Sequence, residues 1–370
     1  MKIKYEFRIL QPEQADPIVC WNEGRDADFL MQWAGKALTY PVTREQILET
    51  QKTSSAVFAI LFEGQMIGTI ALTSVDEQTG RGHIGHFLLD PAMTGKGHGS
   101  AIVQEFVDYC FGILRLRELT LRVFDYNKSA LHCYEKNGFV ERERMKTGQG
   151  DNNLLMGLYK QKIKSSDQTP IVICDETQGD WYATELMTQH AFWNLHWPGC
   201  NEHLLVSNLR KSRDYIPKLS KIAKLGDEIA GAIMYSTAYV VDRTGSRHEV
   251  LTFGPLCVEP RYQSLGIGGK LLRATMQQAR EEGYPAIIIF GESGYYPRFG
   301  FTTCDHFGIT TPEGSNFDAF MGMELRPGSL TGITGKFYEA DVFGDRPAEE
   351  IEAYDSKFPR LVKCKLPGQW

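Results

Sequence analysis

Two stretches of this chain repeat the same order of apolar and polar segments. In the first, the apolar run HFLLD (86–90) precedes the glycine-rich turn GKGHG (95–99) and IVQEFVDYCF (102–111), whose apolar positions recur at helical spacing. In the second, LTFGPLCV (251–258) precedes LGIGG (265–269) and a helical pattern that Gly283 ends. A Tyr-x-x-x-Gly-Phe motif follows each helix. The pattern predicts two copies of one strand–turn–helix fold.

The spacing of the repeated residues supports a duplication. Gly97 and Gly99 correspond to Gly266 and Gly268, each 169 residues later, and the motif tyrosines Tyr134 and Tyr296 are 162 residues apart. The other segments agree: each half begins with a strand (2–10 and 171–176), a helical or irregular region follows (26–52 and 180–215), and a hairpin comes next (55–75 and 223–241). The stretch 327–370 has no counterpart in the first half, and AEEIEAYDSKF (348–358) within it predicts one more helix.

The length and composition fit two soluble domains. At 370 residues the chain exceeds a single comfortable core, and its 42 % apolar and 23 % charged residues are ordinary for a globular protein. The polar stretch KQKIKSSDQTP (160–170) has linker character. We therefore predict a first domain over 1–163, a linker over 164–169, and a second domain over 170–370 with a C-terminal extension.

Several classes of partner are disfavoured. The net charge is −6 and the basic residues are scattered, whereas a nucleic-acid partner needs a concentrated positive face. No apolar run reaches membrane-spanning length, and the N-terminus turns polar too soon for a signal peptide. The eight cysteines are dispersed and form no C-x-x-C pair, which indicates free thiols. We expect a cytoplasmic monomer or homodimer that binds neither nucleic acid nor membrane.

Both glycine turns have the context of a phosphate-binding site. A helix N-terminus carries unpaired amides and the positive end of the helix dipole, and glycines allow a ligand to approach the backbone closely. A single G-x-G is more often a simple strand–helix turn, but its duplication in a matching context favours the binding site. Neither turn ends in the Gly-Lys-Ser/Thr of a Walker loop, and neither has the third glycine of a dinucleotide fingerprint.

At these turns the sequence resembles the GNAT N-acetyltransferase superfamily, whose Gln/Arg-x-x-Gly-x-Gly/Ala signature binds the pyrophosphate of acetyl-CoA. The second half matches in full over 263–268, whereas Thr94 stands in the first half where Gln or Arg is expected. The resemblance implies an α/β protein of two tandem GNAT domains, each a mixed, mostly antiparallel sheet flanked by helices, with acetyl-CoA as co-substrate. It assigns acetyl-CoA binding to two sets of residues, which are Phe87, Leu88, Leu89, Gly95, Lys96, Gly97, His98, Gly99, Ser100 and Asn127 in the first half, and Leu256, Cys257, Val258, Gln263, Ser264, Leu265, Gly266, Ile267, Gly268 and Gly269 in the second.

The resemblance also implies catalytic roles for Tyr134 and Tyr296. A tyrosine at this place in the family protonates the departing thiolate, and a backbone amide of the fourth strand meets the acetyl carbonyl. Each tyrosine could instead pack behind its Gly-Phe turn, and Tyr295 is a close rival to Tyr296. Asn127 matches a CoA-contacting asparagine, with helix capping as the alternative, and the second half has Ile289 at that offset.

No general base follows from the sequence. His83, His86, His248 and Glu249 lie on or before the fourth strands, but isolated groups of this kind are more often solvated surface residues. His190, His196, His203 and Cys200 have spacings that fit no compact metal site, so we predict no metal. We interpret Trp193, His196 and Trp197 as an aromatic lid or packing cluster.

The reaction predicted from the resemblance is direct transfer of acetyl to a primary amine, of a small molecule or a peptide N-terminus, in a ternary complex. One alternative is that a single half is catalytic and the other is a degenerate CoA-binding, structural or regulatory module. A second is aminoacyl transfer on the same tandem fold, which the intact glycine turn of the second half disfavours.

Overall fold

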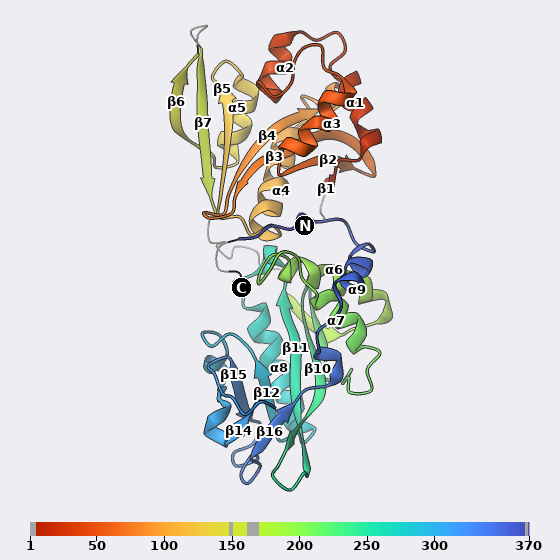
Figure 1. Cartoon of the computed structure of the whole chain (residues 1–370), viewed down its shortest axis with the longest axis vertical. Helices are drawn as coiled ribbons and strands as arrows, with labels where there is room; N and C mark the ends of the chain where they lie inside the picture. The colour runs from red at the N-terminus through yellow and green to blue at the C-terminus, as the bar shows by residue number, and fades with distance from the viewer. Residues whose placement is uncertain (1–4, 148–150, 161–169, 367–368, 370) are drawn as a thin grey trace. The chain divides into compact units, whose positions relative to one another are not determined.

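The computed structural model describes residues 5–147, 151–160, 170–366 and 369 (Figure 1). These residues form two compact units. The first takes in the chain up to Lys160 together with Trp193–Gly199 and the C-terminal segment from Ser356. The second takes in the chain from Pro170 to Phe192 and from Cys200 to Asp355. The expected linker, 164–169, lies outside the described residues, so the domain boundary stays a prediction.

The first unit is built on a seven-stranded sheet of order β1-β2-β3-β4-β5-β7-β6 among the described residues. Only the β4–β5 pair is parallel. The strands are β1 (Tyr5–Ile9), β2 (Ala56–Phe62), β3 (Gln65–Asp76), β4 (Arg81–Leu89), β5 (Glu118–Phe124), β6 (Val140–Lys146) and β7 (Asn152–Tyr159). The helices are α1 (Ala15–Cys20), α2 (Ala27–Ala34), α3 (Arg44–Thr53), α4 (His98–Gly112) and α5 (Lys128–Lys136).

Apolar side chains fix which helix covers which face of this sheet. Helices α1 to α3 bury Ile18, Leu30 and Ile47 against Val57 and Leu88 on one face. Helix α4 covers the other face, where its Phe106 ring contacts Phe58 of β2 at a centroid distance of 5.5 Å. The alternation of strand side chains therefore supplies two separate cores.

The second unit repeats this plan. Seven of its strands pair in the same spatial order as the first sheet. That order is β8-β9-β10-β11-β12-β15-β13, which corresponds to β1-β2-β3-β4-β5-β7-β6. The fold class predicted from the sequence, two mixed and mostly antiparallel sheets flanked by helices, is confirmed. The strands are β8 (Ile171–Asp175), β9 (Lys221–Leu225), β10 (Glu228–Val241), β11 (Arg247–Val258), β12 (Ala286–Phe290), β13 (Thr302–Thr303) and β15 (Phe320–Glu324), and the helices are α6 (Trp181–Phe192), α7 (Glu202–Leu209) and α8 (Ile267–Glu281).

The C-terminal extension adds one short strand and a helix to the second unit (Figure 1). Strand β16 (Gly335–Tyr338) pairs with the end of β10 and with β14 (Ile309–Thr310), and α9 (Ala348–Asp355) is the helix predicted there. The Tyr354 hydroxyl donates to Glu185 of α6 at 2.8 Å, which fastens α9 to this unit. The extension up to Asp355 is therefore part of the second unit.

Candidate active site

Each sheet parts at one parallel strand pair. Strands β4 and β5 pair from Arg81–Glu118 to Ile84–Leu121, and beyond these residues β4 pairs with β3 and β5 with β7. In the second unit β11 and β12 pair only at Leu251–Ile287. We call the opening beyond the last pair the split.

A β-bulge accompanies each split. Leu88 lies opposite Thr69 and Gly85 opposite Ala71, so β4 has one residue more than β3 over this interval. The extra residue corresponds to His86, whose φ is +50°. The second unit repeats the bulge. Ile233 lies opposite Leu256 and Tyr235 opposite Phe253, so β11 again has one residue more than its partner β10 over this interval. A bulge turns backbone groups away from the ladder, which leaves amides free to meet a ligand.

The glycine turns begin helices in left-handed backbone conformations. Gly97 is the N-cap of α4 with φ +83°, and Gly266 is the N-cap of α8 with φ +79°. Among the described residues no side chain caps either helix. A Cβ added to Gly95, Gly97 or Gly266 would meet no described atom within 4 Å. Both helix N-termini are thus open for an anion.

In the first unit, the glycine turn lies next to the end of β4 and next to α5. A Cβ added to Gly99 would lie 3.8 Å from Leu89 Cδ1. Asn137 Nδ2 at the end of α5 donates to the carbonyl and the hydroxyl of Ser100 in α4, each at 3.2 Å. Asn137 was not among the predicted residues, because a polar residue at a helix end has no distinctive sequence pattern.

Several predicted binding residues can offer only backbone groups. The His98 ring forms a hydrogen bond of 2.7 Å with the Tyr5 hydroxyl and packs against the Phe62 ring. Residues of β1 and β2 therefore hold its side chain in place. Leu88, Cys257 and Ile267 have buried side chains in the cores. Burial raises the pKa of Cys257 to about 12, so this thiol stays protonated. Phe87 and Lys96 are partly or fully exposed.

Asn127 has the capping role that was the alternative interpretation. Its side chain accepts a hydrogen bond from the Ala130 amide at 3.1 Å and so begins α5 at the end of β5. Its amide nitrogen has no partner among the described residues, and a contact with a ligand stays a prediction. Thr94 donates its hydroxyl to the Pro91 carbonyl at 2.8 Å, while Gln263 donates to the Val258 carbonyl at 3.4 Å.

Tyr134 and Tyr296 are enclosed by their units. Tyr134 is 8 % exposed and packs edge-on against Phe139, and burial raises its pKa. The Tyr296 ring contacts Phe253 of β11 at 5.8 Å, and burial raises its pKa as well. A Cβ at Gly291 would overlap the Tyr296 ring, so this packing requires glycine there. Neither hydroxyl has a hydrogen-bond partner among the described residues.

Tyr295 has a different environment from Tyr296. A Cβ added to Gly268 would lie 3.0 Å from the Tyr295 hydroxyl and 3.5 Å from Val258 Cγ2. Arg298 stacks over the Tyr295 ring at 3.9 Å from its centroid. The strand end, the α8 N-terminus and the Tyr295–Tyr296 segment therefore meet in the second unit.

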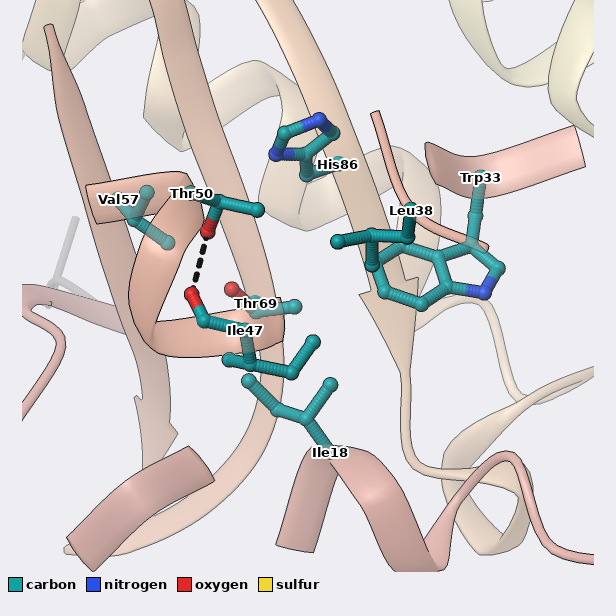
Figure 2. Close-up of a pocket in the computed structure, with 8 residues that line it drawn as sticks. All are labelled: Ile18, Trp33, Leu38, Ile47, Thr50, Val57, Thr69 and His86. Carbon is teal, nitrogen blue, oxygen red and sulfur yellow. Dashed lines mark hydrogen bonds between the residues drawn. The ribbon is translucent and has the colours of Figure 1, made fainter. Parts of the chain in front are cut away.

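The surface interpretation of the histidines is wrong for His86. This side chain is 9 % exposed, and burial lowers its pKa. It lines a small pocket with Trp33, Ile18 and five other residues, which Figure 2 shows. The space in the pocket open to a water molecule is about 10 Å³, enough for one. Thr50 and Thr69 donate to backbone carbonyls, whereas His86 makes a ring contact with Trp33 and has no hydrogen-bond partner among the described residues.

The other base candidates differ in environment. His83 is hydrogen-bonded to Thr120 at 2.8 Å, and burial together with Arg122 lowers its pKa. His248 bonds to Asp242 at 2.8 Å, and Glu249 is exposed. At its bulge the second unit has Gly254 and Pro255, neither of which can accept a proton.

The remaining aromatic and metal predictions concern Trp193 and its neighbours. Trp193 is 2 % exposed and donates to the Val362 carbonyl at 2.8 Å, so it is a packing residue of the first unit. Among the described residues no group of three or more His, Cys, Asp or Glu could hold a metal ion. Within that same part of the chain, no helix combines the length and apolar character needed to cross a bilayer.

The strand order, the bulged split and the glycine-initiated helix, all present twice, define a tandem GNAT acetyltransferase fold. The model of the acetyltransferase (GNAT) family matches residues 21–139 and 181–301. The chain belongs to this family.

Three relatives illustrate the comparison. The uncharacterized N-acetyltransferase YjhQ of Escherichia coli K12 is 32 % identical over 100 residues, which is 27 % of this chain and 55 % of YjhQ. The uncharacterized N-acetyltransferase YhbS of the same organism is 28 % identical over 109 residues, 30 % of this chain and 65 % of YhbS. Its crystal structure with CoA aligns with a TM-score of 0.44 at 20 % identity, covering 50 % of this chain and 98 % of that one. Spermidine N(1)-acetyltransferase of Vibrio cholerae is 39 % identical over 54 residues, 15 % of this chain and 31 % of that enzyme. The chain spans only 55 % and 65 % of the lengths of YjhQ and YhbS.

Proposed function

We propose that this protein is an acetyl-CoA-dependent N-acetyltransferase that moves acetyl to a primary amine by direct transfer in a ternary complex. One observation carries the proposal, and it occurs in both units: a helix N-terminus that no described side chain caps begins at a left-handed glycine beside a split in the sheet. Membership in the acetyltransferase family supports the same reaction. The acceptor is a small molecule or a peptide N-terminus. A cytoplasmic location and a monomeric or homodimeric state stay predictions from the sequence.

The glycine turns would hold the pyrophosphate of acetyl-CoA. The first-turn amides of α4 and α8 point their unpaired hydrogens toward the turn, and the helix dipole favours a dianion there. Gly97 and Gly266 leave room for phosphate oxygens close to the backbone. In the family, acetyl-CoA supplies an activated acyl group, and the strand residues Phe87–Leu89 and Leu256–Val258 would align its arm through backbone groups.

Two groups of each unit would act during transfer. A backbone amide at the bulge of β4 or β11 would stabilise the oxyanion, because the bulge takes that amide out of the ladder. Tyr134 or Tyr296 would protonate the departing sulfur. Burial keeps both phenols protonated at neutral pH, and neither hydroxyl is hydrogen-bonded to any residue that the structure describes.

In the first unit we assign the base to His86. The residue lies at the bulge of β4, and its lowered pKa keeps the imidazole neutral and able to accept a proton at neutral pH. Its side chain makes no competing hydrogen bond within the described part of the chain. A water molecule in the adjoining pocket could link it to the amine.

A second candidate function is that only one unit turns over and the other binds CoA or serves the fold. Thr94 favours this alternative, because its hydroxyl is engaged by the Pro91 carbonyl and cannot extend toward a phosphate as the longer Gln263 can. Under this alternative the first unit is the degenerate one.

Calorimetric titration with acetyl-CoA tests the proposal on the wild type, Gly97→Glu and Gly266→Glu. A carboxylate at either turn would repel the pyrophosphate and fill the space above the amides. We expect two binding sites in the wild type and one in each variant. The matched controls are Gly64→Glu and Gly226→Glu, which impose the same substitution at left-handed hairpin glycines (φ +80° and +59°) with open surroundings. These controls should bind two equivalents, since they share the backbone strain but not the site.

The titration has clear contradictory results. Binding of acetyl-CoA that survives in the Gly97→Glu, Gly266→Glu double variant would sink the assignment of the glycine turns. One site in the wild type, lost only in Gly266→Glu, would favour the degenerate first unit.

A further inference from the structure

The second unit has a buried polar cluster on the sheet face opposite α8. Ser236 of β10 and Thr252 of β11 lie directly opposite each other in the ladder, so their side chains share one face. Both residues are 0 % exposed. The Thr252 hydroxyl donates to Glu339 Oε1 at 3.5 Å. The Ser236 hydroxyl has no hydrogen-bond partner among the described residues, and because an unpaired buried polar group is costly, this hydroxyl is available to a ligand.

The cluster lies at the start of the split. Thr252 follows Leu251, the last residue of β11 that pairs with β12. Phe253, the next residue, points to the α8 face, where it contacts Tyr296. Because side chains alternate along β11, Thr252 lies on the opposite sheet face from Phe253 and Tyr296. Both faces are thus lined where the split begins. Groups on the two faces can reach one reacting centre from opposite sides.

We propose that Glu339, Thr252 and Ser236 receive the ammonium group of the acceptor amine in the second unit, and that Glu339 takes its proton. The inference rests on the proposed function and goes beyond it, because it gives the second unit a base from the C-terminal extension. Three oxygen acceptors suit the three N–H groups of a primary ammonium ion. The first unit, which has no counterpart of the β16–Glu339 segment among the described residues, has His86 instead.

The environment of Glu339 suits a base. Burial raises its pKa to about 7, and the Thr252 hydroxyl opposes this change. Within the described residues no charged side chain shifts this pKa; the Thr252 hydroxyl of β11 is hydrogen-bonded to the carboxylate, and Ser236 of β10 lies opposite Thr252 on the same sheet face. A carboxyl that titrates near neutrality is partly ionised and can both accept and release a proton.

The proton and bond changes balance. The ammonium ion gives one proton to the Glu339 carboxylate, and the freed nitrogen lone pair attacks the acetyl carbonyl. A C–N bond forms and the C–S bond breaks, with the electron pair leaving on sulfur. Tyr296 gives its proton to the sulfur, and the second nitrogen proton, lost as the amide forms, passes through water to Tyr296 and restores it. Glu339 then releases its proton to water, so that one ammonium ion and one thioester give one amide, one thiol and one proton.

Exposed aromatic rings next to the cluster indicate the kind of amine. Phe337, two residues before Glu339, contacts Phe290 at 6.0 Å, and Phe290 stacks on Phe317 at 6.0 Å with an interplanar angle of 19°. Phe290 and Phe317 are 44 % and 49 % exposed. Such rings favour an apolar substituent near the ammonium group. The class is a primary amine with an alkyl or aryl group, and 2-phenylethylamine is a suitable probe.

The test uses the full chain with Gly97→Glu, so that turnover reports the second unit. In this background we expect kcat/KM for 2-phenylethylamine, followed by thiol release, to fall below a pH of about 7, as the carboxylate is lost. Adding Glu339→Gln should lower kcat/KM roughly 10²-fold and remove that acid limb, with the acetyl-CoA affinity unchanged. Glu350→Gln, the same change at an exposed residue of the extension, should match the background.

Further readouts separate this inference from the proposed function. Calorimetry of 2-phenylethylamine against CoA-saturated protein should detect binding in the background and a loss in Glu339→Gln, whether or not turnover occurs. Ser236→Ala should raise KM for the amine several-fold at unchanged kcat. Because the pKa of Glu339 is raised in the folded state, its ionisation lowers stability as pH rises through 7, so Glu339→Gln should melt no lower than the background at pH 8.

Each contrary result points to a different failure. Equal amine binding, equal kcat/KM and a retained acid limb in Glu339→Gln would overturn the assignment of Glu339 while leaving the acetyltransferase intact. Absence of amine binding in the background would also overturn it. Intact amine binding with no thiol release from any amine would instead count against the proposed reaction.

Discussion

At the scale of single residues, the neighbouring Tyr295 and Tyr296 have different surroundings, which suit two different roles. Tyr296 packs between Gly291 and Phe253 beside the split, and its hydroxyl has no hydrogen-bond partner in the described part of the chain. Tyr295 points its hydroxyl at Gly268 in the first turn of α8. We interpret Tyr296 as the proton donor to sulfur and Tyr295 as part of the wall around the phosphate-binding amides.

Phenylalanine substitutions distinguish these roles. In the Gly97→Glu background, Tyr296→Phe should lower kcat roughly 10²-fold without changing the acetyl-CoA dissociation constant, because only the donated proton is lost. Tyr295→Phe should mainly weaken acetyl-CoA binding. Steady-state kinetics with calorimetric affinities checks both, and Tyr134→Phe in the Gly266→Glu background repeats the first test in the other unit. An unchanged kcat in Tyr296→Phe would remove this residue from the chemistry.

At the scale of secondary-structure elements, α5 connects the two ends of the first site. Asn127 begins α5 at the end of β5, and Asn137 ties its other end to Ser100 in the first turn of α4. A shift of α5 would therefore move Tyr134 and the glycine turn together. In the second unit a four-residue 3₁₀ turn, Tyr296–Phe299, stands at this place.

Two substitutions at Asn127 separate capping from ligand contact. Asn127→Ala removes the cap and should cost about 1 kcal/mol of unfolding free energy. Asn127→Ser keeps an oxygen that can cap the helix but lacks the amide nitrogen, so its stability should stay near the wild type. If the amide contacts acetyl-CoA, both variants in the Gly266→Glu background should bind it more weakly. Urea unfolding and calorimetry give the two quantities, and full affinity in Asn127→Ser would leave the residue with a capping role alone.

At the scale of the whole molecule, the two units share one plan and differ on the acceptor side. Both have the same strand order, a bulged split and a left-handed glycine at a helix N-terminus. The first has His86 in a small pocket, whereas the second has Glu339 from its own extension. Different bases and surroundings imply different preferred amines.

Turnover by two independent sites should be additive. For any amine, kcat/KM of Gly97→Glu and of Gly266→Glu should sum to the wild-type value, and the double variant should be inactive. The ratio between the two single variants should change from one amine to another, because the acceptor sides differ. Free-thiol assays over an amine panel measure this. A wild-type rate carried entirely by Gly97→Glu for every amine would indicate that the first unit is not catalytic.

The sequence by itself determined the duplicated architecture and the position of the helix N-termini. Strand alternation, helical spacing and left-handed glycines such as Gly97 and Gly266 are local properties, set by side-chain periodicity and backbone sterics, so they can be read along the chain. The hairpin turns at Gly64 and Gly226 were predictable for the same reason.

Only the tertiary structure decided the surroundings of the candidate bases and tyrosines. His86 is buried because β4 bulges beneath α1 to α3, which no pattern within HFLLD indicates. Glu339 meets Thr252 across 87 positions of sequence, because β16 adds to the end of β10. Burial, pKa and partnership depend on segments that are distant in sequence, so periodicity along the chain carries no information about them.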